Sequence, residues 1–194
     1  MAIDPDVQVL IDALQSQLTD HESRITALEG GSSQSLIGFG AGVTGGEGGT
    51  IYSVDSTLDD GSEGTFRDAL VQLKATSPAP FIIDLSPIAT QTIELQSAFP
   101  YLGGVLNWSL LGHGCEIRIY PLLLPTQTNL FIDNVSIGCG DWNCGAADFD
   151  GGTADALSIG SGSVGVYLRN VTAKWGVDET LSMWQVDQAT MEEC

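Results

Sequence analysis

The chain has 194 residues, which is enough for one main domain and a short appendage. It carries 25 acidic and 6 basic side chains, a formal net charge of −19, so it would repel a nucleic-acid backbone. An anionic polysaccharide is repelled too unless a bound cation such as Ca²⁺ reverses the local charge. The 24 glycines are typical of a turn-rich β fold.

The first residues, Met1-Ala-Ile-Asp-Pro, have neither the basic start nor the apolar core of a secretion signal. No apolar run approaches the length of a membrane span, so no membrane insertion is expected. A secreted enzyme is expected to show a leader, whereas a virion component needs none. This favours a phage structural protein of the virion, with a secreted protein as the alternative.

Residues 4–29 carry a heptad pattern in which apolar positions recur in steps of four and three. Asp4 and Pro5 suit the start of a helix, and Gly30-Gly31 suits its end. Because three heptads are marginal for an isolated helix, we predict that residues 1–30 form a coiled coil for oligomerisation or attachment. An amphipathic helix packed on its own domain is the alternative. The predicted seam consists of Val7, Ile11, Leu14, Leu18, His21, Ile25 and Leu28.

Residues 31–37 are predicted to be a short flexible linker before a body at residues 38–194. The body opens with a glycine-dense segment at 38–52. This segment lacks the preceding strand of a dinucleotide site and the Gly-Lys-Ser/Thr of a phosphate loop. We expect its glycines to permit positive φ angles and close backbone approach.

One short amphipathic helix is predicted at residues 64–73, with Thr65 near its N-cap and Phe66, Leu70 and Leu73 on one face. Short apolar runs separated by turns follow it. Their irregular spacing argues against a hairpin sandwich and favours a stacked parallel coil, whose open end the helix would cap. The runs are 81–85, 92–95, 108–112, 116–120, 129–138, 155–159, 166–175 and 179–183, and residues 186–194 begin another.

The four cysteines are irregularly spaced, at Cys115, Cys139, Cys144 and Cys194. Cys139 and Cys144 flank the sequence Gly-Asp-Trp-Asn, where a local disulfide is feasible and two reduced thiols are the alternative. This spacing, with only two histidines in the chain, argues against a zinc site.

Two motifs carry a resemblance to a known family. They are G-F-G-A-x-x-T-G-G-x-G-G-x-x-Y-x-V at 38–54 and S-E-G-T-F-R-D-A-L at 62–70. With the later stretch at 138–184, they resemble the polysaccharide lyases of the pectate lyase type. The resemblance implies a right-handed parallel β-helix and calcium-assisted β-elimination of polygalacturonate, in which an arginine removes the proton. The expected fold class is therefore mainly β, a partial right-handed parallel β-helix preceded by an α-helical coiled coil.

The same resemblance places Asp155 and Asp178 at acidic positions that often bind calcium in the family, with Glu179 beside the second. Ser182 stands where a third carboxylate is often found. The catalytic arginine of the family belongs to later rungs that this chain does not contain. Because Ca²⁺ prefers oxygen ligands, we predict that the carboxylates of Asp155, Asp178 and Glu179 bind it. The alternative is that they are solvated carboxylates in turns.

Together these features predict a phage tail fibre or tailspike subunit without a complete lyase site. By analogy with viral fibres, the subunit is expected to form a homotrimer. Its other expected partners are phage tail or baseplate proteins and host cell-surface polysaccharide. A calcium-dependent polysaccharide lyase, truncated or completed by another chain, is the alternative. Trp175 and Trp184 could stack on sugars, but each ends an apolar run, so we expect them to pack in the core or at its rim.

Overall fold

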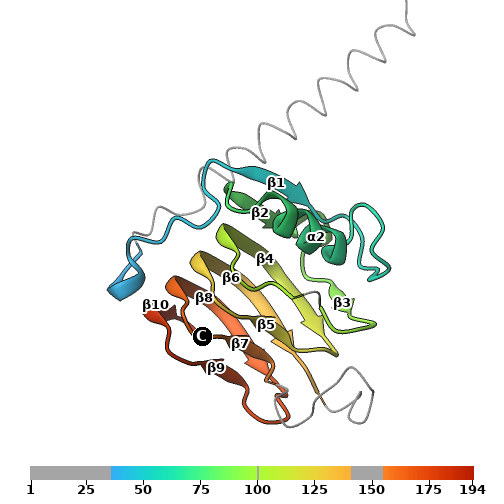
Figure 1. Ribbon diagram of the computed structural model, residues 1–194. Helices are drawn as coiled ribbons and strands as arrows, with labels where there is room; N and C mark the ends of the chain where they lie inside the picture. The colour runs from blue at the N-terminus through green and yellow to red at the C-terminus, as the bar shows by residue number, and fades with distance from the viewer. Residues whose placement is uncertain (1–35, 100, 141–154) are drawn as a thin grey trace, which may run out of the picture. The chain divides into compact units, whose positions relative to one another are not determined.

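The computed structural model describes residues 36–99, 101–140 and 155–194. In this part of the chain the protein is mainly β, with one α-helix and two parallel sheets (Figure 1). The predicted coiled coil and its seam residues lie outside the described residues, as does most of the predicted linker. The larger sheet contains β1 (Thr50–Ser53), β2 (Phe81–Asp84), β3 (Thr92–Glu94), β4 (Leu106–Arg118), β6 (Thr128–Gly138), β8 (Val164–Lys174) and β10 (Asp187–Glu192), and the smaller contains β5 (Leu122–Leu124), β7 (Leu157–Ile159) and β9 (Leu181–Met183).

From β4 onward the chain alternates between the two sheets. The larger sheet has the order β1-β2-β4-β6-β8-β10, with β3 pairing on β4, and the smaller has the order β5-β7-β9. In Figure 1, β4, β6, β8 and β10 lie side by side in chain order. Every pairing between these named strands is parallel, which confirms the prediction of stacked parallel strands.

The core is built from apolar side chains that repeat at the same position in neighbouring strands. Phe81, Trp108, Leu130 and Val166 are in register across β2, β4, β6 and β8, and each is at most 2% exposed. Strand residues alternate between the two faces of a sheet, so a single register aligns a whole column of buried side chains. Burial of each such side chain contributes about 1.5–3 kcal/mol.

The long strands bend at residues in the left-handed backbone region. His113, Asn134 and Asn170, in β4, β6 and β8, have φ angles of 49°, 51° and 52°. Asparagine tolerates this conformation better than most residues. The expectation of separate strands at 108–112 and 116–120 is therefore wrong. The chain turns at His113 with only a register shift, and the two runs form the single strand β4.

Helix α2 (Phe66–Thr76) confirms the predicted helix and its cap. The side chain of Thr65 accepts a hydrogen bond from the Asp68 backbone N–H at 3.2 Å, as expected of an N-cap residue. Phe66, Leu70 and Leu73 are fully buried, on the face that the spacing predicted. The helix packs against the end of the larger sheet that contains β1 and β2 (Figure 1).

Residues 38–49, which we call the strap, run across the strands of the larger sheet rather than along them (Figure 1). The Gly40 N–H donates to Thr190 Oγ1 of β10 at 2.8 Å, and the Thr44 N–H donates to Asn129 Oδ1 of β6 at 2.8 Å. Further along, the Gly46 N–H donates to Ser109 Oγ of β4 at 2.9 Å. These bonds join the strap to β10 at one end of the larger sheet and to β6 and β4 within it.

The strap lies so close to the sheet that some of its positions have no room for a side chain. A Cβ on Gly46 would lie 2.0 Å from the carbonyl oxygen of Phe81. A Cβ on Gly45 would lie 2.2 Å from Ser109 Oγ, and the φ of Gly45 is +55°. The expectation of close backbone approach and positive φ in this segment is therefore confirmed.

Gly46→Ala is expected to lower the free energy of unfolding by about 1–3 kcal/mol, because the added methyl group forces the strap away from the backbone of β2. Urea denaturation followed by tryptophan fluorescence measures this loss. Gly42→Ala is the matched control, since a Cβ at Gly42 meets nothing within 4 Å. Equal stabilities for the two variants would show that the strap does not lie on the sheet in solution.

Candidate functional site

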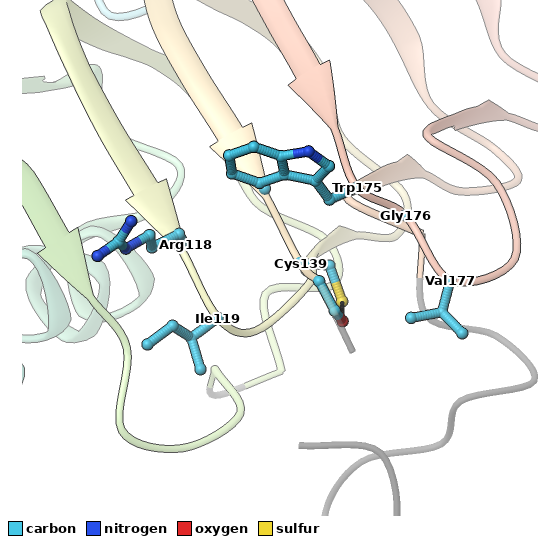
Figure 2. Close-up of a pocket in the computed structure, with 8 residues that line it drawn as sticks. Arg118, Ile119, Cys139, Trp175, Gly176 and Val177 are labelled. Carbon is cyan, nitrogen blue, oxygen red and sulfur yellow. Dashed lines mark hydrogen bonds between the residues drawn. The ribbon is translucent and has the colours of Figure 1, made fainter. Parts of the chain in front are cut away.

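A pocket of about 480 Å³ opens where β4, β6 and β8 end (Figure 2). We call it the strand-end pocket. Its size falls within the range of small-molecule sites. Apart from one arginine, the described residues that line it are apolar or glycine. The lining residues are Arg118, Ile119, Gly138, Cys139, Gly140, Trp175, Gly176 and Val177.

Backbone hydrogen bonds hold the three strand ends together around the pocket. The Ile119 N–H donates to Gly138 O at 2.9 Å, and the Gly140 N–H donates to Trp175 O at 2.6 Å. Ile119, Gly140 and Trp175 all have positive φ angles, of 91°, 70° and 56°. The chain therefore turns sharply at the end of each strand, and these turns form the wall of the pocket.

Among the described lining residues, the indole of Trp175 is a large and exposed aromatic side chain. Figure 2 shows it extending from the end of β8 across the end of β6. A Cβ on Gly138 would lie 3.1 Å from Trp175 Cε3, so the ring fits against the glycine. The Lys174 ammonium lies 4.4 Å from the centroid of the ring. Trp175 nevertheless keeps 60% of its surface exposed.

Trp175 and Trp184 do not pack in the core, so that part of the expectation is wrong, whereas the Trp175 ring lies against Gly138 at the rim. They are 60% and 68% exposed, whereas Trp108 is fully buried. Trp175 directly follows the last residue of β8 in the left-handed region, so it is no longer part of the in–out alternation of the strand. Trp184 likewise follows the last residue of β9.

The two cations nearest the pocket are each paired with a carboxylate. Arg118 donates to Glu94 through Nε, at 3.1 Å, and through Nη2. This hydrogen bonding raises the pKa of the Arg118 guanidinium above its ordinary value. Lys174 Nζ lies 3.1 Å from Glu116 Oε1. Arg118, Gly138 and Lys174 are in register across β4, β6 and β8, so the glycine lies between the two cations, and the pair of Lys174 with Glu116 spans β6.

The acidic residues expected to bind calcium are brought only partly together. Asp155 is 7% exposed, and its Oδ1 accepts a hydrogen bond from the Glu179 backbone N–H at 3.2 Å. The side chains of Asp178 and Glu179 are exposed. Within residues 36–99, 101–140 and 155–194, no group of three or more metal-ligating side chains occurs. Calcium binding at Asp155, Asp178 and Glu179 stays a prediction.

The arginines of the described residues all hold carboxylates. Arg67 pairs with Asp59 at 2.6 Å, and Arg169 pairs with Asp133 at 2.9 Å. Arg118 pairs with Glu94. The predicted disulfide between Cys139 and Cys144 is not tested, because Cys144 lies outside the described residues.

No protein-family model matches the chain, and no curated protein matches it. The resemblance to pectate lyases therefore stays a prediction. Among the described residues, no helix combines the length and the apolar character needed to cross a membrane.

Proposed function

We propose that this protein is a phage tail fibre or tailspike subunit whose body is a right-handed parallel β-helix. The alternation of the chain between two parallel sheets supports this fold. So do the left-handed residues at matching places in β4, β6 and β8, and the helix that covers the first strands. In such a coil the same outer positions repeat along the stack, which provides a long surface for a repeating polymer.

In this proposal the subunit binds polysaccharide on the host surface. The observation that carries it is the exposed Trp175 indole beside the glycine at the end of β6. An indole that is 60% exposed offers apolar aromatic surface against which a sugar ring can stack. The turns around the indole form a preformed wall, so ordering the site on binding costs little entropy.

The proposed role is adhesion rather than complete lyase chemistry. The three arginines of the described body are each engaged by a carboxylate, which supports an attachment function over proton abstraction. In the same proposal, residues 1–30 hold three copies together and attach them to tail or baseplate proteins, and the protein is part of the virion.

Trp175→Ala is expected to weaken binding to host-surface polysaccharide about tenfold, the loss of roughly one interfacial aromatic anchor. The measurement is retention of the full chain on gels that carry capsular or lipopolysaccharide glycans from a panel of bacteria. Trp184→Ala is the matched control, because Trp184 is equally exposed but lies outside the strand-end pocket. Retention on no glycan, or equal retention of the two variants, would contradict the proposed function.

A further inference from the structure

The charges beside the strand-end pocket cancel. Arg118 is matched by Glu94 and Lys174 by Glu116, so the two ion pairs have no net charge. Within the part of the chain that the structure describes, the charged side chains that directly follow Val177 are acidic, the exposed Asp178 and Glu179. With a chain charge of −19, this surface has no excess cation to attract a carboxylate or a sulfate.

The hydrogen-bonding groups at the edge of the pocket suit hydroxyls better than acids. The side chains of Arg118 and Glu94 are 38% and 56% exposed, so the pair offers both donors and acceptors to solvent. A hydroxyl both donates and accepts, and it can join such a pair without breaking it. A carboxylate only accepts, so it would have to displace Glu94 from Arg118 or meet the negative charge of Glu94.

The lining itself favours an uncharged ring. Ile119, Trp175 and Val177 supply apolar side chains, and Gly138, Gly140 and Gly176 supply only backbone. Lys174 lies 4.4 Å from the Trp175 ring centroid. The exposed part of the indole is left for the apolar face of a ligand.

We infer that the strand-end pocket binds an uncharged saccharide and discriminates against its uronate or sulfated counterparts. This inference rests on the proposed polysaccharide binding and names the class of sugar that the site takes. The ion pair of Arg118 with Glu94 is the discriminating element, since it satisfies the arginine and places a negative charge where an acidic sugar would approach.

Matched pairs of polymers test the inference on the full chain. Amylose, galactan and mannan are each immobilised beside the same polymer oxidised at C6, so that the members of a pair differ only in the carboxylate. We expect at least one neutral member to bind about tenfold or more tightly than its oxidised form, and Trp175→Ala to weaken this binding about tenfold. Binding to the neutral member should change little with added salt, because no ion pair forms with the ligand.

Glu94→Gln supplies a second measurement in a protein that is expected to fold, because Glu94 is exposed. The substitution frees Arg118, and we expect binding of the oxidised member to rise roughly threefold while the neutral member is little affected. Glu63→Gln, at an exposed position away from the strand-end pocket, makes the same change in net charge and is the matched control.

The outcomes separate this inference from the proposed function. Equal or tighter binding of the oxidised members overturns the inference and leaves polysaccharide binding in place. Binding to bacterial glycans without binding to any member of the pairs also overturns it. If neither the bacterial glycans nor the pairs bind, the proposed function fails and the inference fails with it.

Discussion

Arg67→Ala is expected to lower the free energy of unfolding by about 3–5 kcal/mol, enough to unfold much of a marginally stable body. The side chain of Asp59 is completely buried, and both of its oxygens accept from Arg67, at 2.9 Å and 2.6 Å. Removing the guanidinium leaves that carboxylate buried without its cation. The same guanidinium donates to the carbonyl oxygens of Ser97 and Ala98, which lose these bonds as well.

Urea denaturation of the purified chain measures this effect, with Arg118→Ala as the matched control. Arg118 also pairs with a carboxylate, that of Glu94, but this pair is exposed, so its loss is expected to change the transition little. Arg67→Lys should recover only part of the stability, because an ammonium cannot reproduce the two-point contact with Asp59. Equal transitions for Arg67→Ala and Arg118→Ala would show that the Asp59 carboxylate is not buried in solution.

The elements that could be predicted from the sequence are those whose signals are local. The N-cap threonine and the spacing of three apolar residues were enough to place α2, and its end differs by only a few residues. The apolar runs located most of the strands, and the long strands such as β6 bury alternate residues over much of their length. β1 and β5 were not among the predicted runs. The continuity of β4 could not be read in the same way. Gly112, His113 and Gly114 look like a strand terminator, but the structure uses His113 as a bend within a paired strand.

The site was harder to predict because it depends on register. Arg118, Gly138 and Lys174 are separated by unequal lengths of chain, and only the pairing of β4, β6 and β8 brings them together. The outward direction of Trp175 depends on a left-handed φ at a residue that is not glycine, for which the sequence holds no clear signal. The strap is an intermediate case. Its glycines predicted that the backbone would approach another segment closely, but they did not indicate which strands it would contact.

A buried glutamine links the turns at one edge of the stack. Gln127 is fully buried, and its Oε1 accepts from Trp108 Nε1 at 2.8 Å. Its Nε2 donates to the carbonyl oxygens of Leu102 and Pro125, each at 2.8 Å. Its backbone N–H donates to Ser163 Oγ at 2.8 Å. One residue therefore satisfies polar groups that lie before β4, within β4, after β5 and before β8. These hydrogen bonds fix the positions of the four segments relative to one another.

Gln127→Leu is expected to lower the free energy of unfolding by about 2–4 kcal/mol. The leucine has a similar volume but leaves the Trp108 indole N–H and the Leu102 carbonyl without this partner, and each buried orphan costs about 1–3 kcal/mol. Gln72→Leu, on the exposed face of α2, makes the same chemical change where water replaces the lost bond, so it is expected to be nearly neutral.

The double variant Gln127→Leu with Trp108→Phe separates a lost hydrogen bond from a change in packing. Phenylalanine has no side-chain N–H to leave unpaired. The loss of stability in the double variant should therefore be smaller than the sum of the two single losses, by about 1 kcal/mol or more. Additive losses would mean that the indole N–H finds another partner and that Gln127 acts by filling space. A clear coupling would identify a polar contact within the apolar column as the feature that holds β4 in register with the turn before β6.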